Sequence, residues 1–400
     1  MRGNRTHTKV ALALFAVAVL ALGACSSGGG GGAAPSPSPT VSRARITTTP
    51  KDGAGHVGIT VKDVGASVAE GTFTSVTLTA QGGKAIPGTL AAARNSWRPS
   101  ANLARGTAYT LTAEAKDPDG RTATTTTRFT TVSPAHSTIA FYTPEDGATV
   151  GVGMEVSFRF DKPVTDHRAA ESAVKITSSG GQQAVGHWFG DRRIDFRPQE
   201  YWRPGSRVTV TFDFDGLELA KGIYGVQDRS YAFTVGREQI STVDAATQQM
   251  TVQQNGATLR TVPVSTGRPQ YATYNGTMVI TEQARQTKMN STTVGLGDEY
   301  DIPDVPHAQR LTDSGTFIHG NYWASPTTFG ADATSHGCIG LPDSQGGDPA
   351  TPASWFYANS LPGDVVIVRN STGGGTVAPD NGLGGWNMAW PAWTAGRAGG

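Results

Sequence analysis

The chain has 400 residues and an almost balanced charge, with 33 Lys and Arg against 32 Asp and Glu. Loss of residues 1–24 would remove three basic and no acidic residues and leave a net charge of −2, so a nucleic-acid partner is not expected. The length predicts two or three domains. With 51 Gly, only 16% charged residues and abundant Thr and Val, the composition favours a mostly β fold.

The first 24 residues have the order of an export signal. A basic segment at 1–9 precedes an apolar stretch at 10–24 that is short for a membrane span. The stretch ends in the lipobox-like sequence LGAC, which places Cys25 at the predicted cleavage site. We expect lipidation of Cys25, because two acyl chains anchor a protein stably to a membrane. The alternative is an ordinary cleaved signal peptide in which Cys25 has no such role.

Residues 25–44 are rich in Gly, Ser and Pro and predict a flexible tether that lifts the folded part off the membrane.

An internal repeat follows the tether. TPKDGAGHVG at 49–58 returns as TPEDGATVGVG at 143–153, and RPSANLARGTAYTLT at 98–112 returns as RPQEYWRPGSRVTVT at 197–211. Alternating polar and apolar residues indicate strands, so we predict two β-sandwich modules, at 45–133 and 134–236. We expect both to be spacers.

A third, mostly β module is predicted at 237–370. It begins with two alternating strands joined at Asn255-Gly256, a strong hairpin signal, and continues with short strands at 276–280, 315–320 and 364–370.

The C-terminal tail, 371–400, carries three Trp residues within eight positions. We expect these rings to dock on the third module rather than lie in solvent.

Cys338 is the second of only two cysteines, and lipidation of Cys25 would leave it without a disulfide partner. His336 lies two residues before it, and His319 lies on a neighbouring predicted strand. An imidazole can take the thiol proton, leave the nucleophilic thiolate, and later protonate a leaving amine. Gly337 lets a substrate carbonyl approach the backbone, whose N–H groups can hold an oxyanion. Spacing alone does not decide which histidine is the base.

Two other interpretations of Cys338 remain. His319, His336 and Cys338 could form a three-ligand zinc site with an open position, although no HExxH or CxxC spacing supports it. Cys338 could also be a buried structural cysteine, which would not explain the two histidines and Gly337. We favour the cysteine nucleophile, with no metal and no cofactor.

The segment HGNYWASPTTFGADATSHGCIGL, residues 319–341, resembles the signature of the YkuD-type L,D-transpeptidases. The resemblance to the mycobacterial and actinobacterial members covers roughly residues 45–395. It implies two immunoglobulin-like domains, a β-rich catalytic domain and a Trp-bearing tail.

The resemblance also implies roles for individual residues. Cys338 would be the nucleophile and His319 the proton acceptor and donor. The carbonyl of Gly320, where some relatives have Ser, would orient His319. His336 would support the loop, and Gly337 with Cys338 would form the oxyanion hole. Tyr300 would contribute a hydroxyl near the oxyanion, and Ser314 and Gly315 would line the groove of the donor stem. Met289 and Trp323 would be parts of a lid that covers the pocket.

Gly340 departs from the family pattern, because relatives usually carry Asn or Arg two residues after the cysteine. A missing side chain here removes a possible hydrogen bond to the bound stem peptide, so Gly340→Asn is expected to improve binding. The alternative is that the backbone at Gly340 needs a positive φ.

The implied reaction is the formation of 3→3 peptidoglycan cross-links from a tetrapeptide donor stem and a second, acceptor stem, through a Cys338 thioester and with release of D-alanine. Carbapenems would acylate the same thiol. The enzyme would act outside the cell membrane, anchored through Cys25 and reaching into the cell wall. Alternatives are an L,D-carboxypeptidase, an enzyme that attaches proteins to peptidoglycan, or an inactive wall-binding lipoprotein.

Overall fold

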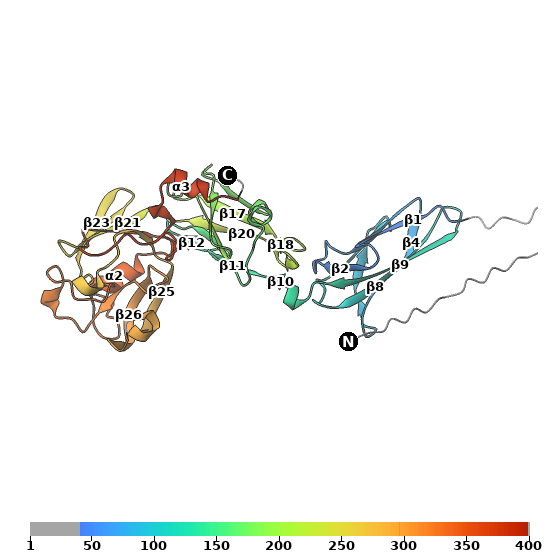
Figure 1. Cartoon of the computed structure of the whole chain (residues 1–400). Coiled ribbons are helices and arrows are strands. Elements are labelled where there is room, and N and C mark those ends of the chain that lie inside the picture. The colour runs from blue at the N-terminus through green and yellow to red at the C-terminus, as the bar shows by residue number, and fades with distance from the viewer. Residues whose placement is uncertain (1–40, 296, 399–400) are drawn as a thin grey trace, which may run out of the picture. The chain divides into compact units, whose positions relative to one another are not determined.

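The computed structural model of the chain describes residues 41–295 and 297–398. The signal sequence, Cys25 and nearly all of the tether lie outside these residues, so the lipid anchor remains a prediction. Strands account for most of the described secondary structure (Figure 1), which confirms the mostly β fold class. Among the described helices none is long and apolar enough to cross a membrane.

The first two sheets use strands between residues 45 and 131. One has the order β1-β3-β7-β6 and the other β2-β9-β8-β4-β5. A common apolar core, which includes Phe73, Trp97 and Leu111, forms from their strands. The strands are β1 (Arg45–Thr49), β2 (Ala54–Val57), β3 (Gly65–Ala69), β4 (Thr72–Ala80), β5 (Ala85–Ile86), β6 (Gly88–Leu90), β7 (Ser96–Pro99), β8 (Ala108–Lys116) and β9 (Thr122–Thr131).

The next strands form two four-stranded sheets, β11-β13-β16-β15 and β12-β20-β17-β14, and a small sheet, β10-β19-β18. They follow the 3-10 helix η1 (Pro134–His136), and α1 (His167–Ser172) lies among them. The strands are β10 (Ser137–Thr138), β11 (Ala140–Thr143), β12 (Thr149–Val150), β13 (Val156–Phe160), β14 (Val174–Ser178), β15 (Val185–Phe189), β16 (Arg193–Arg197), β17 (Arg207–Asp213), β18 (Glu218–Ala220), β19 (Ile223–Gly225) and β20 (Asp228–Val235).

The sequence repeat corresponds to a repeated topology. β1 pairs antiparallel with β3 as β11 does with β13, and β2 pairs parallel with β9 as β12 does with β20. The aspartate of the repeated TPxDG motif has the same task in both copies. Asp52 accepts a hydrogen bond from the backbone N–H of Arg128, and Asp146 accepts one from Ala232. The motif therefore ties the start of each module to its last strand.

The C-terminal module contains two further sheets, β23-β22-β21-β29-β24 and β25-β26-β27-β28. The predicted hairpin is confirmed: β22 and β23 pair around Asn255 and Gly256, both at positive φ, as a two-residue turn requires. The first sheet contains β21 (Gln239–Asp244), β22 (Gln249–Gln254), β23 (Ala257–Pro263), β24 (Gly276–Val279) and β29 (Val365–Arg369). The second contains β25 (Glu282–Asn290), β26 (Asp301–Arg310), β27 (Phe317–Asn321) and β28 (Ile339–Pro342).

Helix α2 (Pro352–Ala358) covers β26, β27 and β28, and its Phe356 enters the core of this module. Two residues explain where the helix begins. The Thr351 side chain caps it by accepting a hydrogen bond from the N–H of Ser354, and Pro352 occupies its first turn. Shorter elements of the module are η2 (Pro269–Tyr271), η3 (Ser291–Val294) and η4 (Pro326–Thr328).

The C-terminal tail contains η5 (Gly385–Asn387) and α3 (Trp390–Ala395), and its three Trp rings do not dock where the sequence suggested. They surround Arg197 of β16, whose guanidinium carbon lies 4.6, 5.4 and 4.4 Å from the rings of Trp386, Trp390 and Trp393. The prediction that the three rings pack on the catalytic module is therefore wrong: Arg197 of the second module makes a cation–π contact with each of them. Other residues of the tail do contact the catalytic module, as Asn387 does at Thr277.

Candidate active site

Cys338 and His319 are brought together by two adjacent parallel strands. β27 carries His319, β28 begins one residue after Cys338, and the register places His319 opposite Gly340. Both side chains open into one cavity of about 320 Å³. Its remaining lining residues are Met289, Tyr300, Ile302, Asn321, Trp323, Ala324, Thr328, Thr334, Ser335 and His336.

The Cys338 thiol is partly buried and donates a hydrogen bond to the carbonyl oxygen of Gly315, with Sγ and O 3.7 Å apart. Burial raises the pKa of Cys338 to about 11. The backbone N–H of Phe317 and the charge of Arg310 act in the opposite direction and offset part of this rise. At neutral pH the thiol is thus protonated. Attack on a substrate needs a base that removes the proton.

His319 is buried, and its ring is fixed by one hydrogen bond. Nδ1 lies 2.8 Å from the carbonyl oxygen of Gly320, to which it donates, so that Nε2 is free to act as a base. Trp323 stacks on the ring, with centroids 5.6 Å apart and planes 18° from parallel. Burial lowers the pKa of His319, while the Gly320 carbonyl and Asp343 raise it. A neutral imidazole at neutral pH is the form that accepts a proton.

The loop before Cys338 is held by Ser335. Its hydroxyl donates to the carbonyl of Cys338 at 2.6 Å and accepts from the N–H of Gly337 at 3.2 Å. Gly337 has φ +108°, a conformation that side chains disfavour, which explains glycine at this position. The Gly337 N–H, expected in an oxyanion hole, thus donates to the Ser335 hydroxyl.

His336 lines the cavity with Cys338 and also contacts the hairpin of β25 and β26. Its Nε2 lies 3.1 Å from Glu299 Oε2, and its ring packs between Tyr271 and Tyr300, with each centroid at 5.0 Å. His336 and Arg268 both bond Glu299 and lower the pKa of that carboxyl. These contacts connect the tip of the hairpin to the loop that carries Cys338.

Ser314 and Gly315 form a turn next to the thiol. Gly315, Met289 and Tyr300 line a second hollow of about 290 Å³, which shares Met289 and Tyr300 with the first. Burial, and then the proximity of Cys338, raise the pKa of Tyr300, so its hydroxyl keeps its proton.

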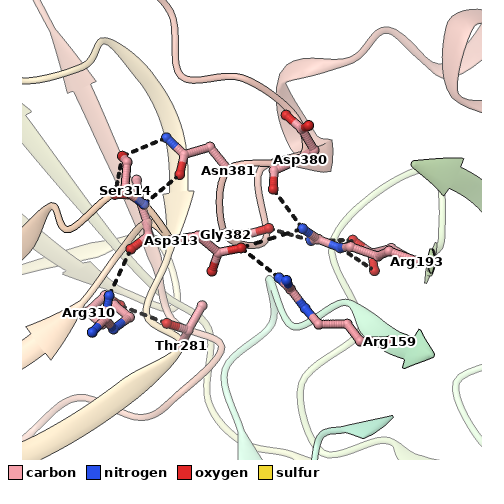
Figure 2. A network of polar contacts seen from close by, with 11 residues as sticks. Arg159, Arg193, Thr281, Arg310, Asp313, Ser314, Asp380, Asn381 and Gly382 are labelled. Carbon is pink, nitrogen blue, oxygen red and sulfur yellow. Dashed lines mark hydrogen bonds and ion pairs between the residues drawn. The ribbon is translucent and has the colours of Figure 1, made fainter. Parts of the chain in front are cut away.

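Figure 2 shows how this turn is connected to the rest of the chain. Asn381 of the tail bonds Ser314, while Asp313 accepts from Arg159 at 2.7 Å. Arg193 donates to the carbonyls of Asp380 and Gly382 on either side of Asn381. The turn beside Cys338 is therefore held by both the tail and the second module.

Gly340 has an ordinary strand conformation, so the alternative that it needs a positive φ is wrong. A Cβ built on Gly340 would lie 3.1 Å from Nδ2 and 3.2 Å from Cβ of Asn321. The Asn321 side chain thus fills the space that a side chain at 340 would use. A side chain at position 340 would therefore be in tight contact with Asn321.

The sequence did not single out several residues that shape the site, namely Asn321, Ser335, Glu299, His307 and Asp343. Asn321 and Ser335 lie inside the quoted signature, so their position in the motif was an available signal. Glu299 and Asp343 are distant in sequence from the histidines that they bond, and no local pattern marks them. In the part of the chain that the structure describes, no three His, Cys, Asp or Glu side chains gather as metal ligands.

Comparison with known families assigns both halves of the chain. Residues 57–218 match the bacterial Ig domain, a single match that spans parts of both predicted sandwich modules, and residues 238–368 match the L,D-transpeptidase catalytic domain. The chain is 35% identical over 360 residues to L,D-transpeptidase 2 of Mycobacterium tuberculosis, covering 88% of this chain and 85% of that relative. It is 29% identical over 361 residues to L,D-transpeptidase 5 of the same species, covering 88% and 76%.

Among solved structures, the complex of LdtMt1 with imipenem is similar over 57% of this chain and 98% of that chain, at 31% identity and a TM-score of 0.48.

Proposed function

Because the chain belongs to the L,D-transpeptidases, a family of cell-wall acyltransferases, we propose that it makes 3→3 peptidoglycan cross-links through an acyl-enzyme on Cys338. The observation that carries this proposal is the shared cavity of Cys338 and His319, with His319 Nδ1 fixed on the Gly320 carbonyl. This arrangement leaves Nε2 as the base next to a thiol that needs one.

In the first half-reaction His319 Nε2 takes the thiol proton while Cys338 Sγ attacks the carbonyl carbon between diaminopimelate and the terminal D-alanine of a tetrapeptide stem. The C–N bond then breaks, the imidazolium returns its proton to the amine, and D-alanine leaves. A thioester between the stem and Cys338 remains.

In the second half-reaction the side-chain amine of diaminopimelate on another stem attacks the thioester carbonyl. His319 accepts a proton from this amine, the C–S bond breaks, and the thiolate is protonated again. No redox step occurs, and none of these steps needs a cofactor. Backbone N–H groups near Cys338 and the Tyr300 hydroxyl are the proposed oxyanion donors. Ser314 and Gly315 would line the groove of the donor stem, and Met289 and Trp323 would be parts of the lid over the pocket.

Incubation of the purified protein with a disaccharide-tetrapeptide, followed by mass spectrometry, tests the reaction. A dimer whose mass equals two substrates minus one D-alanine is the expected product. Tripeptide without dimer would identify a carboxypeptidase instead. Absence of any product, together with absence of a carbapenem adduct on Cys338, would identify an inactive wall-binding protein.

Cys338→Ser is the matched control, since a hydroxyl with its far higher pKa gives no acyl-enzyme under the same conditions.

We also propose that Cys25 carries the membrane anchor. Cys25→Ala is expected to move the protein from the membrane to the soluble fraction without changing the kinetics of the purified enzyme. Retention in the membrane would assign anchoring to an uncleaved apolar segment.

A further inference from the structure

A largely buried His–Asp pair crosses an inner strand of the catalytic sheet at Gly320. β27 lies between β26 and β28, and the pair joins His307 of β26 to Asp343, the residue after β28. His307 Nδ1 and Asp343 Oδ2 are 2.7 Å apart, and the two side chains are 12% and 0% exposed. A Cβ built on Gly320 would lie 2.0 Å from Asp343 Oδ2. The carboxylate thus occupies the space of the side chain that Gly320 lacks.

The Asp343 carboxylate is held by several donors. Besides His307, the hydroxyl of Thr351 and the N–H of Ser344 donate to Oδ1, each at 2.9 Å. Both oxygens of the carboxylate are therefore held by hydrogen bonds.

His307 adopts φ +51°, a conformation that is costly for a residue other than glycine. Such outliers persist where the surrounding structure enforces them, and they cluster at functional sites. Here the ring is held by Asp343 on one side and by Tyr357 of α2, at a centroid distance of 5.3 Å, on the other.

Gly320 links this pair to the proposed base, because its carbonyl accepts the hydrogen bond from His319 Nδ1 at 2.8 Å. We propose that Asp343, fixed by His307, is a positioning residue for catalysis: it holds the Gly320 carbonyl in place and stabilises the imidazolium that forms at His319. The proposal rests on the function proposed above, in which His319 takes the Cys338 proton.

The charges that form during proton transfer are consistent with this geometry. Transfer of the thiol proton creates a positive imidazolium and a negative thiolate in a site where burial disfavours both charges. The negative charge of Asp343 acts against the burial of His319 and raises its pKa. The other titratable or charged groups around the site are His307 and Arg310 of β26, Tyr300 and His336 at the cavity, Glu299 bonded to His336, and Tyr357 of α2.

The rate of Cys338 alkylation by iodoacetamide, measured against pH on the purified full chain, tests the proposal without any peptidoglycan substrate. Peptide mass spectrometry separates Cys338 from Cys25. For Asp343→Asn we expect alkylation at pH 7 to fall on the order of tenfold, the effect of about one pKa unit. The rates should converge with wild type at alkaline pH, where the thiolate forms without His319.

Asp304→Asn is the matched control. Asp304 is also on β26 and is bonded by side chains, those of Tyr322 and Gln345, but it has no contact with Gly320. We expect its pH profile to coincide with wild type. His307→Gln, which leaves the charge of Asp343 but loosens it, should give an intermediate loss at pH 7, and it serves as the test if Asp343→Asn does not fold.

A profile for Asp343→Asn that coincides with wild type, or that falls by one factor at every pH, would overturn the proposal, because a purely structural role predicts the second result. If Cys338 of the wild type reacts with iodoacetamide at neutral pH but the protein makes no cross-links, the proposed function is contradicted. The role of Asp343 in positioning His319 would still hold.

Discussion

The side-chain amide of Asn381 holds Ser314 at two atoms: Oδ1 accepts from its backbone N–H and Nδ2 donates to its hydroxyl, each at 2.9 Å. The next residue, Gly315, accepts the hydrogen bond of the Cys338 thiol. A residue of the tail is therefore two contacts away from the reactive sulfur.

Asn381→Ala is expected to lower kcat/KM for acylation about five- to tenfold, because two hydrogen bonds of about 1 kcal/mol each no longer fix the turn. Steady-state kinetics with a tetrapeptide donor measure it. Asn387→Ala is the control, since this tail residue makes a similar two-point contact with Thr277, away from the thiol. Equal losses in both variants would mean that the tail acts only through overall stability.

His319→Ala should slow acylation of Cys338 by a factor on the order of 10² to 10⁴, the usual contribution of a positioned base. His336→Ala should have a smaller effect, because His336 bonds Glu299 and not the thiol. The rate of adduct formation with imipenem, followed by intact mass, compares the two. A reversed order would assign the base to His336.

Gly340→Asn tests the space next to Asn321. We expect the single variant to lose several-fold in kcat/KM, because Asn321 must move away from the new side chain. The double variant Gly340→Asn with Asn321→Gly should recover most of the activity, since the second change vacates the contact. An improved KM in the single variant would show that a missing contact to the stem, and not space, is what matters at Gly340.

Glu155 gives a prediction about stability and pH. It is fully buried, neither carboxylate oxygen has a hydrogen-bond partner among the described residues, and burial raises its pKa well above the ordinary value, with Asp195 adding to the rise. The unfolded chain loses this proton near pH 4.5, whereas the folded chain keeps it. The contribution of Glu155 to the free energy of unfolding is therefore fully present below that pH and declines as the pH rises. The total loss is about 1.4 kcal/mol for each unit by which the pKa in the folded state exceeds that in the unfolded state.

Glu155→Gln should remove this decline. The unfolding temperature of the wild type is expected to fall between pH 5 and pH 8 relative to that of the variant. Glu200→Gln, an exposed position of the same module, should follow the wild type. Parallel curves for all three proteins would contradict a raised pKa at Glu155.

The sequence was informative where the determinants are local. Asn255-Gly256 predicted the hairpin, the TPxDG repeat predicted two related modules, and the spacing of His319 and Cys338 predicted a common site. It was uninformative where distant segments meet. Arg197 and Trp393 are 196 positions apart, and nothing near either residue signals the cation–π contact. The pairs His307–Asp343 and His336–Glu299 are hidden for the same reason.

The parallel pairing of β2 with β9, and of β12 with β20, determines how each module responds to mechanical load. In both modules an early strand is bonded in parallel to the last one. Tension along the chain pulls these two strands in opposite directions along their length, so that their hydrogen bonds are loaded in shear and must fail together. A peeling geometry would break them one at a time. Each module therefore resists extension where this early strand meets the last one.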